Sequence, residues 1–179
     1  MSDIASDDMG PWLSEEDLDL VRRKVPMLYV DIVPVRVGDD GELEGIGLLM
    51  RARPEGTITR ELVSGRILFQ ETVRQALVRH LDKDLGPLAL PQLPVSPVPF
   101  AVGQYFPTPG QHYLDPRQHA VSLAYVVPVA GDCRPSNDTL ELGWFTAREA
   151  VTPEITADMS EGHADLLRRA LAHLGRLPS

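Results

Sequence analysis

Residues Gly65 to Gly86 read GRILFQETVRQALVRHLDKDLG, and this stretch decides the fold. Glu71 lies six residues after the first glycine, Arg79 lies eight residues after that glutamate, and Asp84 stands two residues before the closing Gly86. A glycine lets the backbone approach a ligand closely, and charged residues two helical turns apart lie along one side of a helix. The stretch therefore sets a glutamate and an arginine about two helical turns apart between two glycines, with an aspartate close to the second glycine.

A helix is predicted from Thr72 to Leu85 because apolar residues recur there at every fourth position. Val73, Leu77 and Leu81 share one side of that helix with Leu85. Gly86, followed by a proline, is a typical end for a helix. The apolar side predicts that the helix packs against a core and leaves its charged side toward a loop or a ligand.

The rest of the chain reads as one α/β domain with strands on both sides of this helix. Helices are predicted from Ser14 to about Val25 and from Ser160 to Leu174. Strands are predicted over Met27–Val37, Gly45–Arg51, 60–63, His119–Val129 and Leu140–Phe145. Residues 87–109 hold seven of the 16 prolines, so they form either an interdomain linker or a long ordered loop. We favour the loop, because the remainder of the chain is too short for a second domain.

Length and composition indicate a single globular domain over residues 12–179 after a disordered tail of residues 1–11. Of the 179 residues, 43% are apolar and 24% are charged, with one cysteine and a net charge of −9. The single Cys133 suits a reducing compartment, and the start of the chain has no signal-peptide pattern, so a cytoplasmic location is expected. We expect no membrane contact, because no apolar run is long enough. The negative charge argues against nucleic-acid binding.

The order of these elements and the Gly65–Gly86 spacing resemble the Nudix hydrolase superfamily, from about Leu13 to Glu149. Its Nudix box reads G-x5-E-x7-R-E-U-x-E-E-x-G-U, where U is a bulky aliphatic residue. The ELGWFT segment from Glu141 to Thr146 resembles the late strand of that family. The resemblance implies the Nudix fold, an α/β arrangement in which a mixed β-sheet is sandwiched between helices. It also implies a box that holds a divalent cation, Mg²⁺ or Mn²⁺, against a diphosphate.

Within that superfamily the chain resembles the GDP-mannose mannosyl hydrolases. It has an early Glu16-Asp17 pair on a helix and a Val30-Asp31-Ile32 step on the following strand. The box is also incomplete, since His80 and Lys83 occupy two of its three glutamate positions. His119 matches a histidine that these enzymes carry at the start of the strand after the box. This resemblance implies a nucleotide-sugar substrate, and a homodimer is one expected form because related enzymes are commonly dimers.

The candidate metal ligands are Asp84, the last carboxylate of the box, and Glu141, which lies where the family often supplies an extra ligand or base. The candidate catalytic residues are Glu141, His119, whose imidazole suits a general base, and Arg79. In the family, however, Glu71 and Arg79 chiefly support the loop–helix–loop. His80 is either a transition-metal ligand or a polar surface residue.

Substrate contacts are expected from Arg51, Arg53, Arg66 and Asp31. Arginine can bind phosphate through two N–H groups at once, and in sugar-nucleotide Nudix enzymes an arginine near Arg51 contacts the diphosphate. The alternative for each arginine is a solvated surface side chain, and for the Gly65-Arg66 pair it is a tight turn. Tyr105 also has two interpretations, since it either stacks on a base or packs under a loop.

Two functions fit these observations. One is a metal-dependent Nudix-type hydrolase that acts on a nucleoside diphosphate-linked compound such as a nucleotide sugar. Attack at the sugar carbon makes the diphosphate the leaving group and needs less support from metal than attack at phosphorus. The other is a catalytically inactive Nudix-fold protein that binds a nucleotide-containing small molecule or a protein partner, which the loss of two box glutamates favours.

Overall fold

The computed structural model describes residues 12–135 and 139–178. The predicted tail of residues 1–11 lies outside the described residues. The helices are α1 (Glu15–Arg22), α2 (Val73–Leu85), α3 (Ala147–Ala150), α4 (Pro153–Thr156) and α5 (Glu161–His173). The strands are β1 (Met27–Val37), β2 (Leu43–Ala52), β3 (Ile58–Glu61), β4 (Val63–Arg66), β5 (Ala101–Phe106), β6 (Tyr113–Leu114), β7 (Ala120–Pro128) and β8 (Glu141–Phe145).

The described strands form one mixed sheet in the order β3-β2-β1-β7-β5-β6. Strand β1 is central, because it pairs in parallel with β7 along its length and on its other side with both β2 and β4. It pairs with β4 through Tyr29–Ile32 and with β2 through Val35–Val37, so the sheet divides beside β1. Strand β8 adds to β2.

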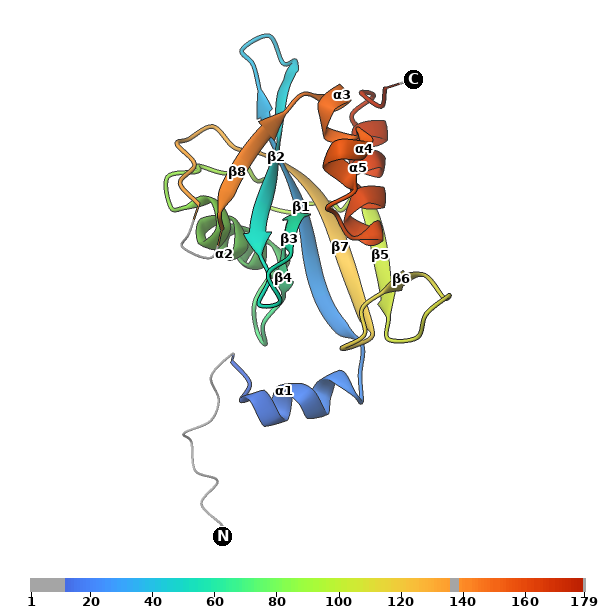
Figure 1. Cartoon of the computed structure of the whole chain (residues 1–179). Coiled ribbons are helices and arrows are strands. Elements are labelled where there is room, and N and C mark those ends of the chain that lie inside the picture. The colour runs from blue at the N-terminus through green and yellow to red at the C-terminus, as the bar shows by residue number, and fades with distance from the viewer. Residues whose placement is uncertain (1–11, 136–138, 179) are drawn as a thin grey trace.

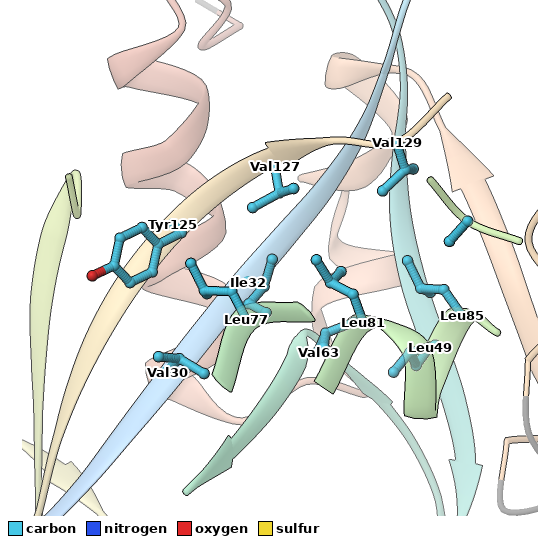
Figure 2. Packing of buried hydrophobic residues seen from close by; sticks show 11 residues of the cluster. Val30, Ile32, Leu49, Val63, Leu77, Leu81, Leu85, Tyr125, Val127 and Val129 are labelled. Atoms are coloured by element: carbon cyan, nitrogen blue, oxygen red, sulfur yellow. The ribbon is translucent and has the colours of Figure 1, made fainter. Parts of the chain in front are cut away.

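Helix α2 covers one face of the sheet and helix α5 covers the other, as Figure 1 shows. The α2 face buries Val30 and Ile32 of β1 against Leu77, Leu81 and Leu85, and Figure 2 shows this packing. The α5 face buries a second cluster; its members include Val33, Val35, Ile46, Leu48, Leu166, Leu167 and Leu171. This alternation along β1 follows from the two-residue period of a strand, and it turns Asp31 toward α5. The predicted mixed sheet between helices is confirmed.

Helix α2 begins and ends where the sequence indicates. The Thr72 hydroxyl accepts a hydrogen bond from the Gln75 N–H, and the Gln75 side chain accepts one from the Thr72 N–H, which closes a capping box. The helix ends at Gly86, whose φ of 89° is unfavourable for other residues. Within the described residues, no helix is both long enough and apolar enough to cross a bilayer.

The proline-rich segment differs from the prediction, because residues 87–109 contain the whole of β5. Strand β5 pairs antiparallel with β7, from Ala101 opposite Ala124 to Tyr105 opposite Ala120. The prolines lie on either side of this strand rather than inside it, so its N–H groups remain free to pair. This strand brings Tyr105 beside the centre of the sheet.

Candidate functional site

Glu71 and Arg79 tie the loop before α2 to the helix. Arg79 donates from Nε and Nη2 to the two carboxylate oxygens of Glu71, both at 2.7 Å, and from Nη2 to the Arg66 carbonyl at 2.9 Å. The hydrogen bond from Arg79 holds the pKa of Glu71 below its usual value, against the effect of burial, and the Leu68 N–H adds to it. These contacts place Arg79 in a supporting role. Its side chain does not line the cavity that opens beside β1.

His80 occupies the space that any side chain at position 65 would fill. A Cβ built on Gly65 would lie 1.8 Å from the His80 ring, so this glycine is required by close packing. The ring Nε2 lies 3.0 Å from the Arg66 carbonyl, and burial lowers the pKa of His80. His80 is therefore a packed part of the box rather than a surface residue.

Replacing Gly65 with alanine is expected to destabilise the protein by about 1–3 kcal/mol, the usual cost of forcing extra volume into a packed core. Thermal or urea denaturation measures the loss. The double variant Gly65→Ala/His80→Ala is the matched control, because removing the imidazole makes room for the new methyl group. The explanation fails if the double variant is no more stable than Gly65→Ala/Arg148→Ala, which keeps the imidazole.

Asp84, the candidate metal ligand, is fully buried and paired with an arginine. Its side chain is 0% exposed, and its Oδ1 lies 2.8 Å from Nη2 of Arg51 and 3.9 Å from Nζ of Lys83. Neither carboxylate oxygen has a well-aligned hydrogen-bond partner, so the charge of Arg51 is the main compensation for burying Asp84. Asp84 does not line the cavity, whereas Arg51 and Lys83 do.

The box residues do not fit a divalent cation. The unpartnered oxygen of Asp84 favours one, but two positive groups already stand within 4 Å of this carboxylate. These two groups would repel a divalent ion placed at the carboxylate and so offset its attraction to the single charge of Asp84. In residues 12–135 and 139–178, no three His, Cys, Asp or Glu side chains are grouped to hold a metal ion.

A cavity of about 940 Å³ opens beside the point where the sheet divides. The lining residues come from all of β1 to β7, from α2 and α5, and from the turn after β2 and the loop before β7. The polar lining residues are Tyr29, Asp31, Arg51, Arg53, Glu55, Glu61, Ser64, Lys83, Tyr105, Asp115, Arg117, Gln118, Ser122, Ser160 and His163. Eight of these lining side chains are Asp, Glu, Arg or Lys, so the cavity is strongly charged.

The floor of the cavity holds a buried pair, Asp31 with His163. His163 Nε2 lies 3.4 Å from Asp31 Oδ1, and the Tyr105 hydroxyl donates to Asp31 Oδ2 at 3.3 Å. Burial raises the pKa of Asp31, but His163 and nearby serine hydroxyls outweigh it and hold that pKa below its usual value. Burial lowers the pKa of His163, but Asp31 outweighs it and holds that pKa above its usual value.

One contact opposes the positive charge on His163. The Leu62 N–H lies 3.3 Å from Nδ1 and needs a lone pair there, which protonation of both ring nitrogens would remove. A neutral ring with its proton on Nε2 can donate to Asp31 and accept from Leu62, whereas the carboxylate favours the charged ring and raises its pKa. The two residues therefore form a buried, pH-sensitive pair on the floor of the cavity, and the charged form is favoured as the pH falls.

The cavity has two chemically different sides. One side carries Arg51, Arg53 and Lys83, with Glu61 pairing to both arginines. The other side carries aromatic and amide groups together with one ion pair. There the Gln118 amide donates to the Tyr29 hydroxyl at 2.9 Å, and Arg117 forms a two-pronged ion pair with Asp115. Such a cavity can hold a ligand that is anionic at one end and carries rings or hydroxyl groups at the other.

The structure brings together only part of the predicted site. Arg51, Arg53 and Asp31 line the cavity, but Arg66 does not, and its carbonyl is used by the box. His119 lies outside the lining, with its ring stacked on Phe106 at 4.5 Å between centroids. The predicted base at this position is therefore not among the residues that line the cavity.

Glu141 lies apart from Asp84. In the antiparallel pairing of β8 with β2, Glu141 is opposite Met50 and Leu142 is opposite Leu49. Leu49 and Leu142 belong to the cluster under α2, so Glu141 projects from the other face of the sheet. The predicted metal site of Asp84 with Glu141 is therefore not assembled, because the two carboxylates lie on opposite faces.

Sequence reasoning missed His163 and left Tyr105 undecided. His163 stands in the first turn of α5, where one histidine in a helix gives no signal of its own. Its partner becomes clear only in the fold, where the alternation along β1 turns Asp31 toward α5 and so toward His163. Tyr105 lies in a segment read as a loop, so the strand that positions it was not expected.

Comparison with known proteins gives both a family and a set of similar folds. The family described as domain of unknown function (DUF4916) matches residues 8–176. A solved structure from Jonesia denitrificans, described as a possible asymmetric diadenosine tetraphosphate hydrolase, is 56% identical, with a TM-score of 0.84. The match covers 87% of this chain and 99% of that one. No curated protein matches the chain.

More distant structures share the fold. A MutT Nudix hydrolase from Burkholderia pseudomallei is 21% identical over 82% of this chain and 98% of its own, with a TM-score of 0.56. The Nudix domain of Shewanella oneidensis NrtR, solved with ADP-ribose, is 17% identical over 90% of this chain and 99% of its own, with a TM-score of 0.60. These likenesses extend the Nudix fold to this chain.

Proposed function

Because this chain belongs to the DUF4916 family and has the Nudix hydrolase fold, we propose that it binds and hydrolyses a nucleoside diphosphate-linked compound in the cavity. The observation that carries the proposal is the cavity itself, which joins a cationic side to an aromatic and amide side. Nucleotide sugars follow from the resemblance to the GDP-mannose mannosyl hydrolases. Dinucleoside polyphosphates follow from the description of the Jonesia denitrificans relative.

In the proposed hydrolysis, water replaces the diphosphate, which keeps the electrons of the broken bond and gains negative charge. The basic side chains on the cationic side suit such a leaving group. Arginine donors at Arg51 and Arg53 would stabilise the negative charge that develops on it. In the absence of ligand, Glu61 pairs with both arginines. When phosphate oxygens bind these arginines instead, the carboxylate of Glu61 loses its partners and becomes available to accept a proton. We assign Glu61 as the general base that removes a proton from the attacking water.

Replacing Glu61 with glutamine is expected to lower turnover by about a hundredfold or more, the usual contribution of a positioned general base. The purified protein is incubated with GDP-mannose, ADP-ribose and diadenosine tetraphosphate, and the released products are separated and quantified. Asp39→Asn, which changes an exposed carboxylate in the turn between β1 and β2, is the control and should keep full activity. Unchanged turnover in Glu61→Gln would remove it as the base.

The assay is run without metal, with Mg²⁺ and with Mn²⁺, because the resemblance implies one of these ions as cofactor. The residues of the box do not build a carboxylate site for either ion, so no step of the proposed reaction passes through a metal. A homodimer and a cytoplasmic location stay predictions.

A second candidate is binding of the same class of compound without hydrolysis. It is favoured by one observation, the Arg51–Asp84 pair at the position where the box would hold its cation. Ligand-induced thermal stabilisation with no product from any of the three compounds would support this candidate over the hydrolase.

A further inference from the structure

We propose that Arg51, Arg53 and Lys83 bind the diphosphate of the ligand directly, in place of a divalent cation. This inference rests on the proposed function, because it concerns how the same cavity holds the same ligand. It differs from the expectation for the fold, in which a metal ion bridges the box and the phosphates.

Arg51 stands at the centre of this arrangement. Asp84, buried behind the guanidinium, lies 2.8 Å from its Nη2 and fixes it, whereas Glu61, which lines the cavity, lies 3.6 Å from its Nε and is the contact that a phosphate would replace. A guanidinium has five N–H donors in a rigid fork, and the remaining donors are available at the cavity, which Arg51 lines with a side chain 16% exposed. A fixed, partly desolvated arginine is well suited to bind two phosphate oxygens together.

The carboxylate of Asp84 stands behind the positive groups. Arg51 and Lys83 both line the cavity, and Asp84 is fully buried and does not. A cation that entered the cavity would meet a guanidinium and an ammonium before any oxygen of Asp84. An anion that entered would meet the same two groups as hydrogen-bond donors, so this pair of side chains suits a phosphate.

This side of the cavity carries three positive charges, from Arg51, Arg53 and Lys83, against three carboxylates, from Glu55, Glu61 and Asp84. It is therefore neutral overall, and its preference for a phosphate rests on the hydrogen-bond donors of the three basic side chains. Lys83 is 55% exposed, so its ammonium can turn toward a ligand at little cost. Two linked phosphates offer enough oxygens to contact all three side chains.

Inorganic pyrophosphate tests the inference without the rest of the ligand. Its binding to the full chain is measured by isothermal titration calorimetry in excess EDTA and again in MgCl₂. We expect binding in EDTA at least as tight as in MgCl₂, because Mg²⁺ masks the charges that the arginines contact. Binding that requires Mg²⁺ would overturn the inference and leave the proposed function standing, whereas no binding in either buffer, of pyrophosphate or of ADP-ribose, would overturn both.

Variants then identify the groups that bind. Arg51→Met/Asp84→Leu removes the guanidinium and its buried counter-ion together, which preserves folding better than either change alone. We expect it to weaken binding in EDTA by about ten- to a hundredfold, the range for loss of a charged hydrogen bond. Lys83→Ala should weaken it in the same direction, and Arg148→Ala, an exposed arginine of α3, should not. Equal affinity in all four proteins would contradict the assignment.

A titration with Mn²⁺ alone gives a readout that is independent of the ligand. Electron paramagnetic resonance reports free Mn²⁺, and we expect the wild-type protein to leave its signal unchanged. A stoichiometric loss of signal that Asp84→Asn abolishes would show that Asp84 binds a metal after all, and the inference would fail.

Discussion

Replacing Arg51 with alanine should lower the free energy of unfolding by about 3–5 kcal/mol, the usual cost of leaving one member of a buried ion pair without its partner. Asp84 is fully buried, has no well-aligned hydrogen bond, and depends on the guanidinium 2.8 Å away. Lys83 is exposed and farther away, so it cannot replace the lost charge. Urea denaturation at neutral pH measures the change.

Two controls separate this effect from a general loss of charge. Arg53→Ala removes a half-exposed guanidinium that pairs with Glu61, and surface pairs of this kind contribute about 1 kcal/mol or less. Arg51→Met/Asp84→Leu should recover most of the stability lost in Arg51→Ala, since apolar replacements of buried pairs are often neutral or stabilising. If the double variant were as unstable as Arg51→Ala, the ion pair would not be the cause.

Replacing Asp31 with asparagine should also destabilise the protein by about 3–5 kcal/mol, with a loss that depends on pH. The raised pKa of His163 stabilises the fold fully below its unfolded value of about 6.5, and this contribution is lost as pH rises through the folded pKa. The lowered pKa of Asp31 stabilises the fold above its unfolded value of about 4, and this contribution is lost as pH falls through the folded pKa.

The stability difference between wild type and Asp31→Asn should therefore be greatest between about pH 4 and pH 6.5 and smaller at alkaline pH. Urea denaturation of both proteins across this range gives the profile. Asp31→Asn/His163→Gln is the matched control, because it removes both charges and should restore a flatter difference. Glu61 and Arg53 also influence the pKa of His163 and are kept in both variants. A difference that rises steadily from pH 6.5 to pH 9 would refute the charged pair.

The sequence predicted the fold well, because its strongest patterns describe local structure. Apolar residues four apart marked α2, and a run of β-branched residues marked β1 with both of its ends. The spacing of the box residues then gave the resemblance to the Nudix superfamily, which implied how these elements are arranged. Strand β5 was missed for a local reason, since prolines on both sides of a short strand resemble the composition of a loop.

The site was predicted less well, because its contacts join residues that are distant in the chain. Arg51 and Asp84 were each singled out, but no pattern indicated that they pair with each other. Glu141 was placed with Asp84 because both stand near the box in the family, and only the register of β8 on β2 puts them on opposite faces of the sheet. His163 and Asp31 meet across 132 positions, beyond the reach of any periodicity.

A crystal structure of the protein grown with ADP-ribose and MgCl₂ tests the central claim most directly. We expect the diphosphate to lie within hydrogen-bonding distance of Arg51, Arg53 and Lys83, with the Arg51–Asp84 pair intact. A magnesium ion bound by Asp84 between the protein and the diphosphate would contradict the direct contact. A nucleotide bound outside this cavity would contradict the assignment of the site itself.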